Sequence, residues 1–194
     1  SSITISPVIP HHLEAVTNKL QESGSKIMIE DNSISINSKE IKGVDIETAP
    51  FPGFPTDLQA PFTALMTIAN GESKIIEKIF ENRMNHVHIL NKMGANIKLN
   101  KNIAYVKGVK KIKGMDLVGS DLRSSAALII AGIVAEGTSS IYGLEHLDRG
   151  YENFESKLKI LGIKINREFN KKTVTNKEFK MNSDAEDIPK YNAA

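Results

Sequence analysis

A chain of 194 residues, of which 40% are hydrophobic and 25% charged, can bury a sizeable core and has the composition of a soluble globular domain. A formal net charge of only +2 provides no electrostatic signal for nucleic acid or membrane, and the absence of cysteine excludes a disulfide or a thiolate nucleophile within this stretch. The longest apolar run, residues 126–135, is too short to cross a bilayer. We therefore expect a soluble, cytoplasmic protein with no nucleic-acid or membrane partner.

The first elements in the chain are a helix and a β-hairpin. Apolar residues at helical spacing begin at Leu13 and lead to Gly24, a residue suited to a left-handed helix cap. Strands follow at residues 26–29 and 33–36, on either side of an Asp-Asn turn.

A longer arrangement of the same kind begins at residue 56. Thr56 and Asp57 can start a helix, although Pro61 is expected to delay its regular beginning by a turn. Alternating apolar patterns then predict a strand, a second helix and a hairpin, at residues 73–80, 84–93 and 97–106.

The same order returns about 66 residues further along the chain. Asp121 then corresponds to Asp57, and the new first helix contains the uncharged run 126–135. A helix that is apolar on nearly all sides is expected to lie almost entirely buried between sheets. A strand at 139–147 and a second helix at 150–161 complete the copy.

These repeats predict an α/β fold in which helices pack against mixed sheets. The helix and hairpin of residues 13–36 match only the second half of the repeated unit, so about two and a half units are expected here, with a first half upstream. The strands around Ile27 and Ile34 would then border an open edge or an apolar gap.

The periodicity fades beyond residue 169. Residues 170–181 include four lysines, Lys171, Lys172, Lys177 and Lys180, and residues 182–194 are polar. We assign residues 1–169 to one domain and 170–194 to a weakly ordered tail, with a short strand at Thr173-Val174.

Acidic and basic residues at the junctions before helices are the candidates for chemistry. Asp57 and Asp121 can each act as a helix cap or as a functional carboxylate. Arg83, Arg123 and Arg149 can each bind a phosphate or carboxylate through two N–H groups, or pair with neighbouring acids. The pattern favours an anionic ligand and leaves these alternatives open.

Other common catalytic patterns are missing from the sequence. The histidine pairs His11-His12 and His86/His88 do not have a metal-ligand spacing, and no glycine-rich phosphate loop is present. We therefore expect no metal.

Five segments resemble the enolpyruvyl transferase family, in the form found in members that use UDP-N-acetylglucosamine. The resemblance extends from about Pro10 to Glu168. The segments are FPTDLQAPF (54–62), FENR (80–83) with HV (86–87), MGA (93–95), SDLRSSA (120–126) and DRGYE (148–152).

This resemblance implies the C-terminal portion of a two-domain enzyme with its active site in the cleft between the domains. Each domain would be an inside-out α/β barrel of three βαβαββ units, with about two and a half units of one barrel present here. The implied reaction transfers the enolpyruvyl group from phosphoenolpyruvate to the 3-hydroxyl of UDP-N-acetylglucosamine, the first committed step of peptidoglycan synthesis. It requires no cofactor. The partners are the two substrates and the missing N-terminal part of the enzyme, and the isolated segment is expected to be inactive.

The resemblance also implies roles for individual residues. Asp57 matches an aspartate that contacts the sugar 3-hydroxyl and serves as general base, and Asp121 matches one tied to cleft closure and catalysis. Arg123 and Arg149 match arginines that hold phosphoenolpyruvate.

Three further positions are implied on the sugar side of the cleft. Arg83 matches an arginine that helps to organise this side, and Thr56 and Ile79 fall where the family contacts the nucleotide sugar. Two alternatives remain: the related shikimate-pathway transferase, and a non-catalytic half module.

Overall fold

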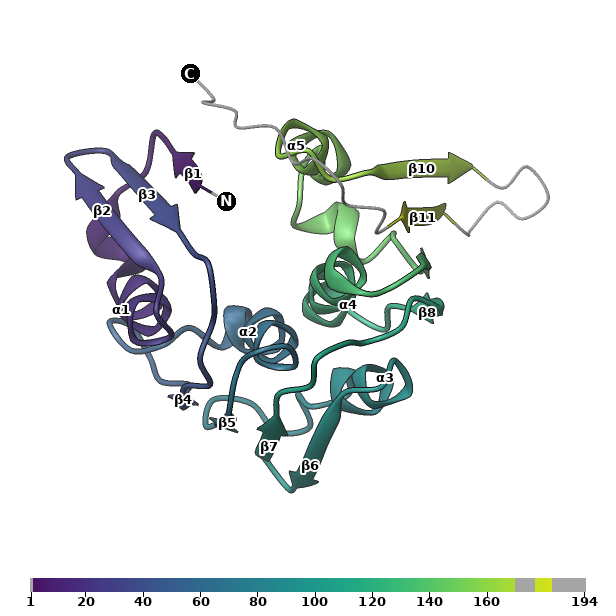
Figure 1. Cartoon of the computed structure of the whole chain (residues 1–194), viewed down its shortest axis with the longest axis horizontal. Helices are drawn as coiled ribbons and strands as arrows, with labels where there is room; N and C mark the ends of the chain where they lie inside the picture. The colour runs from purple at the N-terminus through teal and green to yellow at the C-terminus, as the bar shows by residue number, and fades with distance from the viewer. Residues whose placement is uncertain (1, 170–176, 183–194) are drawn as a thin grey trace.

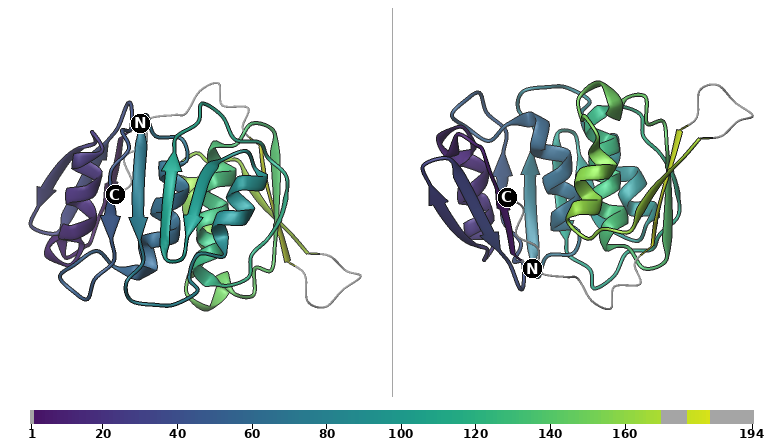
Figure 2. Two further views of the ribbon diagram at one scale, coloured as in Figure 1. Left: turned by 90° about the horizontal axis from the view of Figure 1, so that it is seen from below. Right: turned by 90° about the horizontal axis from the view of Figure 1, so that it is seen from above.

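The computed structural model describes residues 2–169 and 177–182. Three β-sheets lie on the outside of the molecule and enclose a group of helices (Figure 1). The strand orders are β1-β3-β2, β4-β5-β7-β6 and β8-β9-β11-β10. Viewed from below, the second sheet lies in front of the helices (Figure 2, left). The strands are β1 Ser2–Ile5, β2 Lys26–Glu30, β3 Ser33–Asn37, β4 Ile46–Glu47, β5 Glu72–Ile76, β6 Asn96–Asn100, β7 Ile103–Lys107, β8 Asp116–Val118, β9 Thr138–Tyr142, β10 Ile165–Phe169 and β11 Lys177–Asn182.

The predicted repeat of helix, strand, helix and hairpin is confirmed. Two units follow the same order, β4-α2-β5-α3-β6-β7 and β8-α4-β9-α5-β10-β11. In each unit the first two strands pair in parallel and the remaining pairs are antiparallel. The helices are α1 Glu14–Glu22, α2 Gln59–Met66, α3 His86–Lys92, α4 Leu122–Val134 and α5 Phe154–Ile160, with 3-10 turns at Pro10–Leu13, Thr56–Leu58 and Leu147–Arg149.

Equivalent glycines end the second helix of each unit. Gly24, Gly94 and Gly162 have φ values of +101°, +100° and +83°. L side chains rarely adopt this left-handed conformation, so glycine is favoured at all three positions. The helix caps expected from the sequence are therefore present.

The core lies around α2 and α4, which pack side by side in the middle of the molecule (Figure 1). Ala127, Leu128 and Ile129 of α4 are fully buried, whereas Val134 at its end is 41% exposed. The prediction that residues 126–135 are almost entirely buried is thus confirmed, except that Ile130 and Ile133 are partly buried and Val134 is exposed. The regular helix α2 begins at Gln59, after a 3-10 turn, so the delay expected from Pro61 is also observed.

The first sheet agrees only in part with the expectation for the half unit. Strand β1 pairs with β3, which therefore has partners on both sides, and the free edges of this sheet are β1 and β2. The strand around Ile34 does not border an open edge, because β1 supplies the neighbour that precedes the second helix in the other units.

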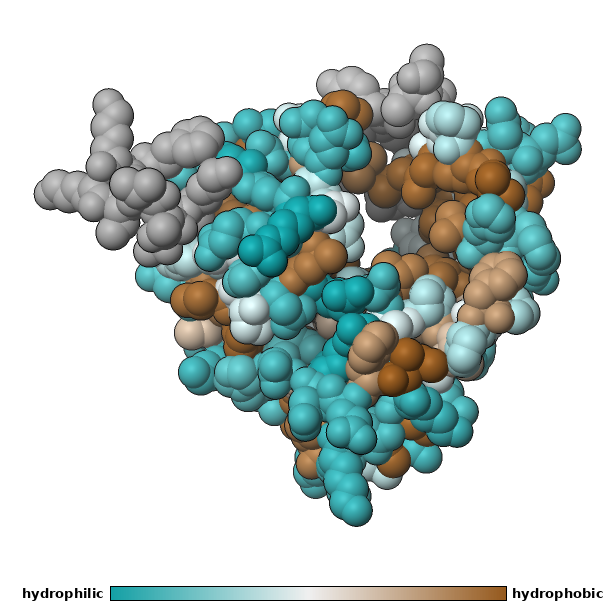
Figure 3. Space-filling view, turned by 180° about the vertical axis from the view of Figure 1, so that it is seen from behind, coloured by the Kyte–Doolittle hydropathy of each residue, from teal (hydrophilic) through white to brown (hydrophobic). Residues whose placement is uncertain are grey.

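One face of this sheet is apolar and incompletely covered. The register places six isoleucines on it, and of these Ile5 is 47% and Ile29 54% exposed. Figure 3 shows hydrophobic residues around a hollow on this side of the molecule. We call this surface the isoleucine face; it consists of Ile3, Ile5, Ile27, Ile29, Ile34 and Ile36.

The assignment of residues 170–194 to a weakly ordered tail needs one correction. Lys177–Asn182 form β11, which pairs with both β9 and β10 and so completes the third sheet. This strand occupies the place that β7 has in the second sheet. The strand expected at Thr173-Val174 lies outside the described residues.

Two further expectations concern membranes and metals. In the part of the chain that the structure describes, no helix combines the length and apolar character needed to span a bilayer. Within the same residues, no group of three or more histidine, aspartate or glutamate side chains is placed to hold a metal ion.

Candidate active site

Charged side chains from the two complete units meet beside the first turns of α2 and α4. The Nε group of Arg123 donates a hydrogen bond of 2.5 Å to Oδ1 of Asp57, although the two residues are 66 positions apart. The Nη1 atom of Arg83 lies 3.6 Å from the same oxygen. We call Asp57, Arg83, Asp121 and Arg123 the arginine–aspartate cluster.

The two aspartates have different local roles. Asp121 precedes α4 and accepts hydrogen bonds of 3.0 Å from the backbone N–H groups of Arg123 and Ser124, so it is a helix cap. Asp57 lies within a 3-10 turn and makes no capping hydrogen bond with its side chain. Its side chain is 63% exposed. The helix-cap alternative therefore holds for Asp121 and is wrong for Asp57.

Arg83 is the more enclosed of the two arginines. Its side chain is 19% exposed, its Nη1 donates to Oγ1 of Thr56 at 2.8 Å, and its guanidinium lies 3.8 Å from the centre of the Phe80 ring. Burial and the charge of Arg123 lower the pKa of Arg83, while Glu77 and Asp57 oppose this change. An arginine pKa starts so far above neutrality that the group keeps its charge.

Glu77 organises this region and was missed by the sequence analysis. Its side chain is 1% exposed and accepts hydrogen bonds from the hydroxyls of Thr48 and Thr56, both at 2.8 Å. It also accepts hydrogen bonds from the backbone N–H groups of Ile79 and Phe80. The signal was present in the strand pattern, because alternation from Ser73 and Ile75 places Glu77 on the buried side, where a carboxylate needs several donors.

A cavity of about 210 Å³ opens beside the cluster. Arg83, Asp121 and Arg123 line it together with two nearly buried polar residues, His86 and Ser124, each 2% exposed. Burial lowers the pKa of His86 to about 4, so its ring is neutral near pH 7. The cavity thus combines the guanidinium groups of Arg83 and Arg123 with the carboxylates of Glu81 and Asp121 and with neutral polar side chains. The two arginines are the groups in it that can bind an anionic ligand.

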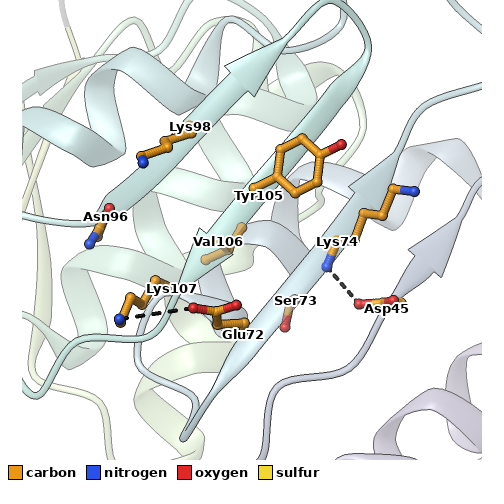
Figure 4. A pocket seen from close by; sticks show the side chains of 9 residues that line it. All are labelled: Asp45, Glu72, Ser73, Lys74, Asn96, Lys98, Tyr105, Val106 and Lys107. Atoms are coloured by element: carbon orange, nitrogen blue, oxygen red, sulfur yellow. Dashed lines mark hydrogen bonds and ion pairs between the residues drawn. The ribbon is translucent and has the colours of Figure 1, made fainter.

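A larger cavity of about 700 Å³ lies on the outer surface of the second sheet (Figure 4). Some of its charged side chains already have partners. Nζ of Lys107 lies 3.9 Å from the carboxylate of Glu72, and the carboxylate of Asp45 accepts a hydrogen bond from the backbone N–H of Lys74. None of the residues predicted to carry chemistry lines this surface. We therefore place the candidate site at the arginine–aspartate cluster.

The structure brings together most of the predicted site residues. Thr56 joins the cluster through Arg83, and Ile79, 37% exposed, follows Glu77. Arg149 is exposed in the 3-10 turn after β9, and its side chain makes no hydrogen bond or ion pair within the described residues. That turn packs against α4. Tyr151, two residues after Arg149, has a pKa raised by burial and by the charge of Asp57, which shows that this segment lies near the cluster. Arg149 therefore lies on a segment near the cluster without joining it.

The fold agrees with comparisons to known proteins. Residues 1–158 match the family model described as EPSP synthase (3-phosphoshikimate 1-carboxyvinyltransferase). The chain belongs to this enolpyruvyl transferase family. Among solved structures, it resembles the enolpyruvyl transferase NikO from Streptomyces tendae, with a TM-score of 0.73 and 24% identity over 83% of this chain and 38% of that one. It also resembles EPSP synthase from Acinetobacter baumannii, with a TM-score of 0.70 and 14% identity over 94% of this chain and 42% of that one. At these identities the likeness shows the fold alone.

More similar sequences carry a narrower description. UDP-N-acetylglucosamine 1-carboxyvinyltransferases of Prochlorococcus marinus are 85% identical in strain MIT 9301 and 82% identical in strain MIT 9312, over all of this chain. The chain spans 42% of the length of these relatives.

Proposed function

We propose that this chain is part of an enzyme that transfers the enolpyruvyl group from phosphoenolpyruvate to the 3-hydroxyl of UDP-N-acetylglucosamine, the first committed step of peptidoglycan synthesis. The observation that carries the proposal is the position of Asp57, whose carboxylate faces Arg83 and Arg123, the two arginines that line the neighbouring cavity. The description of relatives up to 85% identical supports this acceptor. We place the enzyme in the cytoplasm.

In the proposed reaction, Asp57 takes the proton of the 3-hydroxyl as the hydroxyl oxygen attacks C2 of phosphoenolpyruvate, while a proton from solvent adds at C3. The tetrahedral adduct then returns a proton from C3 to solvent and expels phosphate, which restores the double bond. Arg123 and Arg149 would hold the carboxylate and phosphate of the donor, whose charges shift during both steps. Asp121 would act at cleft closure, and Thr56, Ile79 and Arg83 would contact the sugar side.

The ion pair between Asp57 and Arg123 fits this scheme. Oδ1 of Asp57 accepts a hydrogen bond of 2.5 Å from Nε of Arg123, so this oxygen already has a hydrogen-bond donor. The donor substrate carries anionic groups that can take the place of Asp57 on Arg123. Binding of the donor would then release Asp57 to accept the proton of the sugar.

The proposal includes the rest of the fold. A helix equivalent to α2 and α4, supplied by the remaining part of the protein, would cover the isoleucine face and complete an inside-out barrel of three units. The exposure of Ile5 and Ile29 supports this, because large apolar surfaces are rarely left open in soluble proteins. The active site would form in the cleft between this domain and a second one.

Two alternatives predict different results. Shikimate-pathway transfer agrees with the description of the matching family, but the more similar relatives act on the sugar nucleotide according to their name. A non-catalytic half module would not need Asp57, Asp121 and both arginines of the cluster together.

The test uses a full-length chimera, in which these 194 residues replace the matching segment of the relative from strain MIT 9301. Phosphate release from phosphoenolpyruvate is measured with UDP-N-acetylglucosamine or with 3-phosphoshikimate as acceptor. We expect release only with the sugar nucleotide. Release with 3-phosphoshikimate would support the first alternative. An inactive chimera beside an active unaltered relative would support the second.

A further inference from the structure

Glu77 is the most completely enclosed carboxylate near the cluster, and its hydrogen bonds separate into two groups. Oε1 accepts the Thr48 hydroxyl and the backbone N–H of Ile79, both at 2.8 Å, together with the N–H of Phe80 at 3.1 Å. Oε2 accepts the Thr56 hydroxyl at 2.8 Å. One oxygen therefore fixes the turn after β5, while the other faces a residue of the site.

The hydroxyl of Thr56 links Glu77 to Arg83. A hydroxyl has a single proton, and here that proton is directed to the carboxylate of Glu77. The lone pairs of Thr56 Oγ1 then accept a hydrogen bond of 2.8 Å from Nη1 of Arg83. The negative charge of Glu77 thereby determines which way the Thr56 hydroxyl points.

A second connection reaches Arg83 through the turn after β5. Glu77 accepts hydrogen bonds from the backbone N–H groups of Ile79 and Phe80, and so it fixes the backbone position of Phe80 and with it the position of the Phe80 ring. That ring lies 3.8 Å from the guanidinium carbon of Arg83. Arg83 is thus held from two sides by groups that both depend on Glu77, and it lines the cavity beside the cluster.

We infer that Glu77 is a positioning residue, which orients the Thr56 hydroxyl and the Phe80 ring so that Arg83 is fixed for contact with the sugar nucleotide. The inference rests on the proposed function, since that function places Arg83 on the sugar side. The carboxylate of Glu77 is not needed to hold the backbone at this position. The backbone N–H of Glu77 donates a hydrogen bond to the carbonyl oxygen of Asn102, independently of the side chain.

The substitution Glu77→Gln tests the inference with almost no change in shape. The amide oxygen can still accept the donors at the Oε1 position, but an NH₂ group then faces Thr56 and can no longer accept its proton. In the full-length chimera we expect the KM for UDP-N-acetylglucosamine to rise about tenfold, the loss typical of one charge-assisted hydrogen bond. The KM for phosphoenolpyruvate and kcat should change less than about threefold.

A matched control and a double substitution separate positioning from stability. Glu72→Gln makes the same chemical change on the same strand but at the solvent-facing surface, and it should leave both KM values unchanged. Thr56→Ala should raise the KM for the sugar nucleotide by itself. Adding Glu77→Gln to it should then have little further effect, because both changes break one connection.

The inference is overturned if Glu77→Gln lowers the melting temperature without raising the KM for UDP-N-acetylglucosamine, or if its effect adds fully to that of Thr56→Ala. Should Glu77→Gln not fold, Glu77→Asp keeps the charge but withdraws it from Thr56, and an unchanged KM in that variant would equally overturn it. Failure of the proposed function is distinguishable, because the unsubstituted chimera would then show no turnover with this acceptor.

Discussion

At the scale of residues, the site is defined by one carboxylate that faces arginines from two repeats. Asp57 belongs to the first complete unit, and Arg123 to the second, yet they form the shortest charged contact of the site, at 2.5 Å. The equivalent of Asp57 in the second unit, Asp121, caps α4 instead. Equivalent positions of the repeat have therefore acquired different tasks.

Conservative arginine substitutions should affect the donor substrate selectively. Arg123→Lys and Arg149→Lys keep the charge but lose the planar group that binds a carboxylate or phosphate at two points. We expect kcat/KM for phosphoenolpyruvate to fall by about tenfold or more, with UDP-N-acetylglucosamine affinity largely kept. Steady-state kinetics with each substrate varied in turn would check this. A loss confined to UDP-N-acetylglucosamine would show that our assignment of these arginines is wrong.

His86 should make the stability of the protein depend on pH. Its folded-state pKa of about 4 lies below the ordinary value of 6.5, so the unfolded chain binds the proton more readily between these values. The stability of the neutral buried ring is complete above pH 6.5 and decreases as the pH falls towards 4. At pH 5 the loss should be about 2 kcal/mol.

The measurement compares denaturation at pH 7.5 and pH 5 for the chimera and for its His86→Gln variant. The variant should lose less stability on acidification. His88→Gln, an exposed histidine on the same helix, should behave like the parent protein. An equal pH effect in the parent and in His86→Gln would contradict the prediction.

At the scale of elements, α4 supports the arrangement of the site because its first turn carries Arg123 and its body fills the core. Leu128 is completely buried between the sheets. Leu128→Ala should therefore lower the free energy of unfolding by about 2–5 kcal/mol, through lost burial and the cavity left behind. Val134→Ala, at a position that is 41% exposed, should cost about 1 kcal/mol or less. Urea denaturation monitored by circular dichroism would distinguish these outcomes, and similar losses for both variants would contradict a buried α4.

The elements were largely predictable from sequence because periodicity, helix caps and the repeat agreed. The hairpins and the burial of residues 126–135 followed from local pattern alone. Strand β11 was not predictable in this way, since its pairing with β9 and β10 comes from distant sequence and not from local alternation. Strand alternation places Glu77 on the buried side, but its hydrogen bonds with Thr48 and Thr56 could not be predicted, because these residues approach it only in the folded chain.

At the scale of the whole molecule, the isoleucine face should behave differently in the isolated chain and in a complete protein. Ile29 is 54% exposed here but would be covered by the proposed helix. Ile29→Lys should therefore reduce aggregation of the 194-residue chain, yet destabilise the full-length chimera by about 2 kcal/mol or more.

Met28 provides the control for this prediction. It is 67% exposed and lies next to Ile29 on the opposite face of β2, so Met28→Lys should have little effect on stability in either protein. Light scattering of the isolated chain and melting temperatures of the chimera give the two readings. Ile29→Lys without cost in the chimera would contradict the proposed covering helix.

The central claim is that Asp57 is the base of enolpyruvyl transfer to the sugar nucleotide. The most direct test is to measure kcat and UDP-N-acetylglucosamine affinity for the Asp57→Asn variant of the full-length chimera. This change nearly preserves shape while removing the basic oxygen, so kcat should fall by about 10²–10⁴-fold and affinity should change little. Unchanged turnover, or a loss of affinity with kcat preserved, would contradict the account.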